Sequence, residues 1–148
     1  MSFHVEIIAV GRLKKTSPFY TLFHDYAQRL QGKFSLIELD GHSQAEELQK
    51  IKNKISPSAT LIALDERGKT LSSIEFSKKL ETIQTNHPGK IQFVIGGADG
   101  LDDEIRQKAS LILCFSRMTW PHMMARMMLI EQIYRAQQIL ANHPYHRE

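Results

Sequence analysis

Several features that mark special classes of protein are scarce in this chain of 148 residues. It has 1 cysteine, Cys114, which has no partner for a disulfide within the chain, so we expect a reducing compartment and a cytoplasmic protein. No apolar run approaches the ~20 residues that a membrane-spanning helix needs. The N-terminus also lacks the order of charged and then apolar residues that is typical of a signal peptide. We therefore expect neither a secreted disulfide scaffold nor a membrane protein.

Motifs for metals, nucleotides and covalent catalysis are missing as well. His143 and His146 lie near the C-terminus, but no cysteine or carboxylate cluster accompanies them and Pro144 prevents a regular helical pair, so we predict no metal site. The glycine-rich segment Gly96–Gly100 has neither the G-x-G-x-x-G spacing nor the Gly-Lys-Ser/Thr of a phosphate-binding loop. No serine has the surroundings of a nucleophile elbow, and Cys114 lies within a predicted strand. Covalent catalysis is therefore not supported.

What the chain does have is the composition and pattern of one ordinary α/β domain, residues 1–148. Hydrophobic residues make up 42% and charged residues 24% of the chain. Strands are predicted at Val5–Val10, Phe34–Leu39, Ala59–Leu64, Ile91–Ile95 and Leu111–Phe115. Helices are predicted at Pro18–Leu30, Ser43–Ile55, Ser72–Asn86, Asp102–Ala109 and Pro121–Ala141. This alternation predicts a mainly parallel sheet flanked by helices.

The charges have an uneven distribution. The net charge is +3, yet basic residues outnumber acidic ones strongly between Arg12 and Lys33, and the last part of the chain carries arginines without lysines. These arginines are Arg117, Arg126, Arg135 and Arg147. Guanidinium groups suit bidentate contacts with phosphate or carboxylate, which is compatible with a nucleic-acid partner. Scattered solubilising charge is the alternative that the sequence leaves open.

Three unusual loops follow predicted strands. They are Asp65–Lys69, the glycine-rich Gly96–Gly100, and the segment from Phe115 to Trp120. In open α/β sheets, ligands bind at the carboxyl ends of the strands, where such loops lie. Glycine permits close approach of a ligand to the backbone, and the aromatic and methionine side chains offer apolar walls. Plain turns and a hydrophobic loop packed into the core remain the alternatives.

The predicted C-terminal helix has two apolar stripes instead of one. Leu129 and Ile133 belong to the first stripe, and Met127, Ile130 and Tyr134 belong to the second. Together they exceed the arc of ~100° that one sheet face would bury. Because the second stripe requires another partner, we predict a homodimer.

Four segments of the chain resemble one known family. They are FVIGGADGL, FSRMTWPHMMARMMLIEQIYRAQQI, the ending NHPYHRE and the short LDERGK. The first three occur in the family's order, and over essentially the whole chain the segments resemble the RlmH family of ribosomal RNA large-subunit methyltransferases, in the SPOUT superfamily. The resemblance implies an α/β domain with a C-terminal trefoil knot, a homodimer and S-adenosyl-L-methionine as the methyl donor. It also implies methyl transfer to N3 of a pseudouridine in 23S rRNA of the assembled ribosome.

The resemblance also implies which residues hold the methyl donor. They are Leu64, Gly96, Phe115, Ser116, Arg117, Met118, Thr119 and Trp120. Two alternatives to this activity are a SPOUT-type methyltransferase with another RNA target and a non-catalytic ribosome-binding factor that uses the same fold.

For the chemistry, the candidates lie near the C-terminus. N3 of pseudouridine carries a proton that must leave before the nitrogen can attack a methyl group. His146 is a candidate base or proton relay, and Arg135 or Arg147 a candidate for stabilising the anion of the base. Tyr145 is a candidate for stacking on the target base or orienting it.

Overall fold

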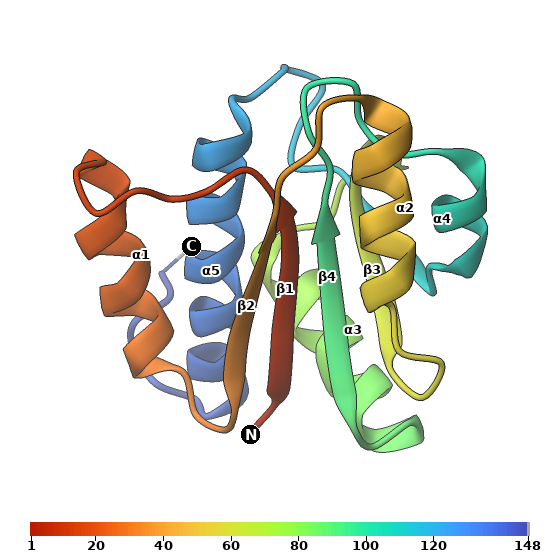
Figure 1. Cartoon of the computed structure of the whole chain (residues 1–148). Coiled ribbons are helices and arrows are strands. Elements are labelled where there is room, and N and C mark those ends of the chain that lie inside the picture. The colour runs from red at the N-terminus through yellow and green to blue at the C-terminus, as the bar shows by residue number, and fades with distance from the viewer. Residues whose placement is uncertain (148) are drawn as a thin grey trace.

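The computed structural model describes residues 1–147, and its centre is a parallel sheet of five strands (Figure 1). The strands are β1 (His4–Val10), β2 (Phe34–Leu39), β3 (Thr60–Lys69), β4 (Lys90–Ile95) and β5 (Leu111–Leu113). Their order in the sheet is β2-β1-β4-β3-β5, and every neighbouring pair is parallel. The predicted α/β class with a mainly parallel sheet is confirmed.

Helices cover both faces of this sheet. Helices α1 (Pro18–Arg29), α3 (Ser73–Asn86) and α5 (His122–Leu140) lie on one face, and α2 (Gln44–Lys54) and α4 (Asp103–Lys108) lie on the other (Figure 1). Neighbouring residues of a strand alternate between the two faces. In β1, Ile7 packs into the core under the first group of helices, whereas Ile8 packs into the core under the second. Because both faces are buried, the strands have the near-continuous apolar runs of parallel sheets.

Each of the first four helices begins at a side-chain cap. The predicted capping box at the start of α3 is present: the Glu75 N–H donates to Ser72 Oγ at 3.1 Å, and the Ser72 N–H donates to Glu75 Oε1 at 2.8 Å. The hydrogen bond from the Ser72 N–H holds the pKa of Glu75 below its ordinary value. The other caps are Ser17, Ser43 and Asp102.

The ends of β3 and β5 differ from the prediction. β3 continues beyond Leu64 to Lys69, so Asp65–Lys69 is not a simple loop. After a register shift, Lys69 pairs with Leu113, where β5 ends. Gly68 makes this possible, because a Cβ atom there would lie only 2.5 Å from the Ile112 carbonyl oxygen. Since β5 ends at Leu113, the prediction that Cys114 lies within the strand is wrong.

The second apolar stripe of α5 has a partner within the same chain. Ile130 is completely buried and Met127 nearly so, and the rings of Tyr26 in α1 and Tyr134 in α5 lie 5.7 Å apart. A second copy of the chain is therefore not needed to cover Met127 and Ile130, because α1 of the same chain packs there, and the homodimer stays a prediction. No helix among residues 1–147 combines the length and hydropathy that crossing a membrane requires.

Candidate functional site

The carboxyl ends of the parallel strands bring the predicted cofactor positions together. Leu64 pairs with Ile95 in β4 on one side and with Leu113 in β5 on the other. Gly96 directly follows Ile95, and the segment from Phe115 to Trp120 begins two residues after Leu113. Strand pairing alone therefore places the three predicted segments at one edge of the sheet.

Gly96 begins a tight turn that closes at Gly100. Gly97 and Gly100 form an isolated bridge, in which the Gly100 N–H donates to the Gly97 carbonyl oxygen at 3.0 Å. A Cβ atom on Gly96 would lie 2.9 Å from the carbonyl carbon of Gly100, so a side chain at this position would push the turn open. The turn consequently presents bare backbone at the sheet edge, as close approach of a ligand requires.

The segment from Phe115 to Trp120 is organised by one hydroxyl. Ser116 Oγ accepts hydrogen bonds from the Met118 N–H at 3.1 Å and from the Trp120 indole N–H at 2.9 Å. The Met118 side chain is 73% exposed and that of Trp120 is 38% exposed. Within residues 1–147, no other N–H group of this segment's backbone has a hydrogen-bond partner. The segment therefore offers unpaired amides and solvent-facing apolar side chains.

These features fit the adenosyl part of the implied methyl donor. A purine ring has apolar faces and polar edges, and it needs apolar walls together with backbone groups that can form hydrogen bonds. The glycine turn and the Ser116-centred segment supply both. Arg117, Thr119 and Leu64 complete the predicted set on the same edge.

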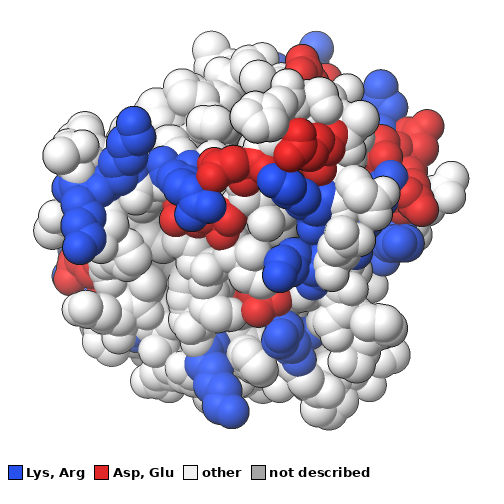
Figure 2. Space-filling view, viewed as in Figure 1, with Lys and Arg blue, Asp and Glu red and all other residues white. Residues whose placement is uncertain are grey.

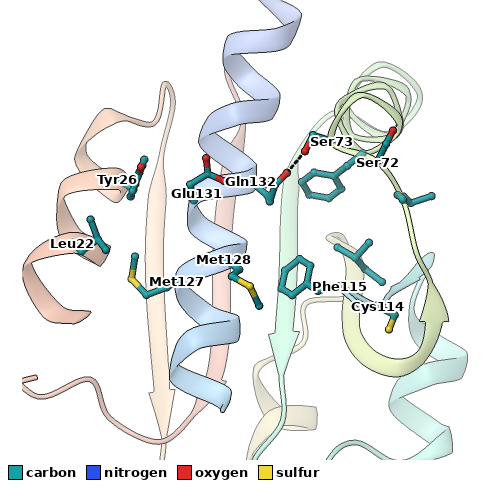
Figure 3. Close-up of a pocket in the computed structure, with 13 residues that line it drawn as sticks. Leu22, Tyr26, Ser72, Ser73, Cys114, Phe115, Met127, Met128, Glu131 and Gln132 are labelled. Atoms are coloured by element: carbon teal, nitrogen blue, oxygen red, sulfur yellow. Dashed lines mark hydrogen bonds between the residues drawn. The ribbon is translucent and has the colours of Figure 1, made fainter. Parts of the chain in front are cut away.

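A cavity of about 450 Å³ opens between α1, α3 and α5 (Figure 3). Phe115 is the only member of the predicted set among its lining residues. The lining consists of Leu22, Tyr26, Leu71, Ser72, Ser73, Phe76, Leu113, Cys114, Phe115, Met127, Met128, Glu131 and Gln132. Ser73 Oγ donates to Gln132 Oε1 at 2.7 Å across its rim. Sequence reasoning missed this cavity, because its lining comes from helices that are far apart in the chain.

The C-terminal segment turns back onto α5. Asn142 adopts a φ of +56°, and the segment then returns toward the space between α1 and α5 (Figure 1). The Tyr145 hydroxyl donates to Glu131 Oε1 at 3.0 Å and lies 3.1 Å from the Tyr26 hydroxyl. Burial, with these two hydrogen bonds, raises the pKa of Tyr145, so its phenol stays protonated. The segment is thus held by specific contacts instead of being a frayed end.

Arg135 lies between the carboxylate of Glu131 and the imidazole ring of His146. Its Nη2 and Nε donate to Glu131 Oε1 at 2.6 and 3.0 Å, and its Nη1 lies 3.1 Å from His146 Nδ1. The hydrogen bond to Glu131 raises the pKa of Arg135 in spite of partial burial. The structure therefore brings together three of the four predicted catalytic residues, while the fourth, Arg147, follows His146 in the chain and is exposed.

Within one chain, the cavity lies between the C-terminal segment, with Tyr145 and His146, and the segment from Phe115 to Trp120. Tyr26 and Glu131, which hold the C-terminal segment, line one side of it, and Cys114 and Phe115 line the other (Figure 3). Within residues 1–147, no hydrogen bond, ring pair or cation–π contact joins Tyr145 or His146 to the segment from Phe115 to Trp120. We found no group of three or more potential metal ligands in the described part of the chain.

Basic and acidic side chains are mixed on the face that includes α2 (Figure 2). Arg12 pairs with Asp40 at 2.6 Å, and Lys50 pairs with Glu46 at 3.2 Å. Lys14 and Lys15, on the segment after β1, are exposed. Since acidic groups neutralise many of the basic ones, this face carries no continuous positive field.

Comparisons with known proteins agree with this geometry. A family described as "Predicted SPOUT methyltransferase" matches residues 3–146. The chain is 47% identical to the ribosomal RNA large subunit methyltransferase H of Rhodospirillum centenum, over 95% of this chain and 97% of the relative. It is 39% identical to the protein of that name from Acholeplasma laidlawii, over 97% of this chain and 99% of the relative.

A solved structure has a similar fold. It is that of a probable methylase family protein from Haemophilus influenzae, with a TM-score of 0.60 and 13% sequence identity. The match covers 100% of this chain and 72% of that chain. At this low identity, the likeness concerns the fold alone.

Proposed function

The chain belongs to the SPOUT methyltransferase family, and from this premise we propose that it methylates N3 of a pseudouridine in 23S rRNA. In this proposal the methyl donor is S-adenosyl-L-methionine, and the substrate is the assembled ribosome in the cytoplasm. One observation carries the proposal: Leu64, Gly96 and the segment from Phe115 to Trp120 meet at one edge of the sheet. The resemblance to the family implies the methyl donor at these positions.

The methyl donor would be held mainly by backbone groups. Gly96 leaves room beside the turn, and the unpaired amides of the segment from Phe115 to Trp120 can bind the polar edge of the adenine. Met118 and Trp120 can cover its faces. When bound, S-adenosyl-L-methionine supplies a methyl group that its sulfonium has already activated, so the protein's tasks are alignment and removal of the N3 proton.

The target base would meet the C-terminal segment. Loss of the N3 proton leaves negative charge on the two carbonyl oxygens that flank this nitrogen, and hydrogen-bond donors stabilise such charge. Arg135, His146 and Tyr145 form one connected cluster with suitable groups. Arg147 is exposed beside them and can reach a phosphate or the base itself.

A homodimer would bring together the two parts of the proposed site. These are the cofactor edge (Leu64, Gly96 and the segment from Phe115 to Trp120) and the C-terminal cluster (Glu131, Arg135, Tyr145 and His146). In one chain, the C-terminal cluster and the cofactor edge lie on different sides of the cavity, so we propose that the C-terminal segment of one copy completes the cofactor edge of the other. The exposed apolar side chains Leu22 in α1 and Met124 in α5, with exposed fractions of 47% and 37%, support a contact through these helices. Light scattering tests it: the protein should be a dimer and Leu22→Glu a monomer, whereas a monomeric wild-type protein contradicts the proposal.

We also propose that the chain is knotted near its C-terminus, as the family resemblance implies. The support is the path of the chain after β5. It leaves the sheet at the edge strand β5, where Lys69 pairs with Leu113, and continues to α5, where Arg126 donates to the carbonyl oxygen of Gly11 directly after β1.

The small net charge supports an assembled particle as the substrate. A net charge of +3 per chain, with basic and acidic groups mixed on the face shown in Figure 2, supplies little of the phosphate attraction that binding of isolated RNA requires. We therefore expect weak methylation of a naked rRNA fragment. The paired substitution Lys14→Glu and Lys15→Glu should weaken ribosome binding, while the same change at the exposed Lys78 and Lys79 of α3 serves as the control with equal charge.

The decisive experiment maps the methyl group at nucleotide resolution. Ribosomes from cells that lack the protein are incubated with the purified protein and the methyl donor, and the 23S rRNA is then sequenced for modification. Methylation of N3 of one pseudouridine supports the proposal, and methylation elsewhere identifies another RNA target. If the protein binds ribosomes but neither binds the methyl donor nor modifies rRNA, it is a docking factor and the proposal is wrong.

A further inference from the structure

We infer that the C-terminal segment presents His146 as a hydrogen-bond donor through Nε2, and not as the general base of the reaction. This inference rests on the proposed methyl transfer, and it assigns a role within the cluster around Glu131. The cluster joins Glu131 and Arg135 of α5 to Tyr145 and His146 of the C-terminal segment.

The guanidinium group of Arg135 determines which nitrogen of His146 carries the proton. Arginine has only donors and remains charged in proteins. Two of its nitrogens donate to Glu131 Oε1, which fixes the plane of the group and leaves Nη1 facing His146 Nδ1 at 3.1 Å. Because Nη1 can only donate, Nδ1 must accept. The proton of the neutral ring is therefore on Nε2.

Glu131 is the positioning residue of this arrangement. Besides Arg135, its Oε1 accepts the Tyr145 hydroxyl at 3.0 Å, and its Oε2 accepts from Gln132 Nε2 at 2.9 Å. The Arg135 guanidinium carbon lies 4.8 Å from the centre of the Tyr145 ring, and this ring meets the Tyr134 ring edge-on at 4.8 Å. Arg135 and the two residues of the C-terminal segment are consequently held from several sides, and the histidine orientation is built in before substrate arrives.

A ring in this state cannot remove a proton at either nitrogen. Nδ1 is already engaged by a cation, and Nε2 carries the proton. The Nε2–H group can instead donate to a carbonyl oxygen of the target base, where negative charge collects when N3 loses its proton. In this scheme the N3 proton passes to water, the nitrogen lone pair forms the new bond to the methyl carbon, and the carbon–sulfur bond breaks. His146 neither gains nor loses a proton.

The substitution His146→Gln tests this role directly. A glutamine amide places an N–H donor at nearly the distance of the imidazole Nε2, but it is not a base. We expect single-turnover methylation of ribosomes by His146→Gln to stay within about threefold of wild type, and that by His146→Ala to fall about 100-fold, the typical cost of removing one such donor. His87→Gln, at the end of α3, is the control for an unrelated histidine.

Two results of that assay would overturn the inference. If His146→Gln is as slow as His146→Ala while both bind the methyl donor like wild type, the histidine acts as a base. If His146→Ala is as fast as wild type, the residue has no part in the reaction. A wild-type protein that methylates no RNA refutes the proposed function, but it leaves the protonation state of the ring to be measured by itself.

Nitrogen-15 NMR of histidine-labelled protein makes that measurement without activity. The His146 signals, identified by their loss in His146→Gln, should show an unprotonated Nδ1 and a protonated Nε2 near pH 8. Arg135→Met should abolish this preference, because the donor to Nδ1 is gone. A protonated Nδ1 in the wild-type protein refutes the inference.

Glu131→Gln tests the positioning role. Weaker orientation of Arg135 should lower kcat about tenfold, while KM for the methyl donor stays unchanged. An increase in that KM with kcat unchanged would show that Glu131 serves the cofactor edge and would overturn its assignment as a positioning residue.

Discussion

Arg126 is a buried charge that joins the start of α5 to the end of β1. Its side chain is 2% exposed. Nη1 donates to Glu38 Oε2 at 2.6 Å, Nη2 donates to the carbonyl oxygen of Gly11 at 3.1 Å, and the buried Nε has no partner within residues 1–147. The same Glu38 oxygen accepts the Leu13 N–H at 2.6 Å. One ion pair therefore fixes both α5, which follows the cofactor segment, and the loop after β1.

We predict that Arg126→Met lowers the free energy of unfolding by about 2–3 kcal/mol. Removing one partner of a buried pair costs about 3–5 kcal/mol, because the other charge remains buried without compensation. Two features reduce this cost here: the Glu38 side chain is 21% exposed, so water can reach it, and methionine removes the unsatisfied Nε. Urea unfolding followed by circular dichroism, at one fixed protein concentration because association adds to stability, measures the change.

The double variant Arg126→Met with Glu38→Gln separates charge from packing. Glutamine keeps an acceptor for the Leu13 N–H but leaves no unpaired charge, so the double variant should be about 1 kcal/mol more stable than Arg126→Met alone. If the double variant is the less stable of the two, the carboxylate of Glu38 is well hydrated and the reasoning is refuted. Affinity for the methyl donor should fall in Arg126→Met and recover in part in the double variant.

Three other perturbations test separate parts of the molecule. Gly96→Ala should lower the affinity for the methyl donor, measured by calorimetry, by about tenfold, because the added Cβ atom would collide with the backbone of Gly100. Gly97→Ala should lower this affinity less, because the atom nearest to its Cβ is the end of the flexible Glu47 side chain. Ser72→Ala should lower the free energy of unfolding by about 1 kcal/mol through loss of the cap, measured by urea unfolding. Burial alone would raise the pKa of Glu6, but hydrogen bonds, above all from Gln92, hold this pKa below its ordinary value. The lowered pKa stabilises the folded protein above about pH 4.5, and this stabilisation is lost as the pH falls further. Gln92→Leu should raise the pKa of Glu6 and reduce this acid-sensitive stability, which urea unfolding at a series of pH values measures.

Most of the fold was accessible from the sequence, because the strands are buried on both faces. Continuous apolar runs such as Ile91–Ile95 and cap residues such as Ser72 report local structure, and local structure sets the order of strands and helices. The extension of β3 to Lys69 could not be predicted from the sequence. It depends on pairing with β5 after a register shift between Leu64 and Lys69, and neither the periodicity nor the composition of the sequence indicates such a shift.

The candidate site divides in the same manner. That the three segments after β3, β4 and β5 lie together could be predicted, because parallel strands end at one edge of a sheet. Tyr26 and Glu131, which hold the C-terminal segment, could not be predicted, because their partnership with Tyr145 requires knowing that the chain reverses at Asn142 and returns along α5. A sequence pattern reports no such contact between helices far apart in the chain.

The two halves of the site are built by different means, and this difference bears on how they would work. The proposed cofactor edge offers mainly backbone groups, namely the space beside Gly96 and the unpaired amides of the segment from Phe115 to Trp120. The C-terminal cluster consists of the side chains of Glu131, Arg135, Tyr145 and His146, which hydrogen bonds join to one another. A prearranged cluster loses little conformational entropy when a ligand binds, so in the proposed function it would need no large basic surface to hold the target base. If the substrate is an assembled particle, as we propose, that arrangement would suit a chain of low net charge.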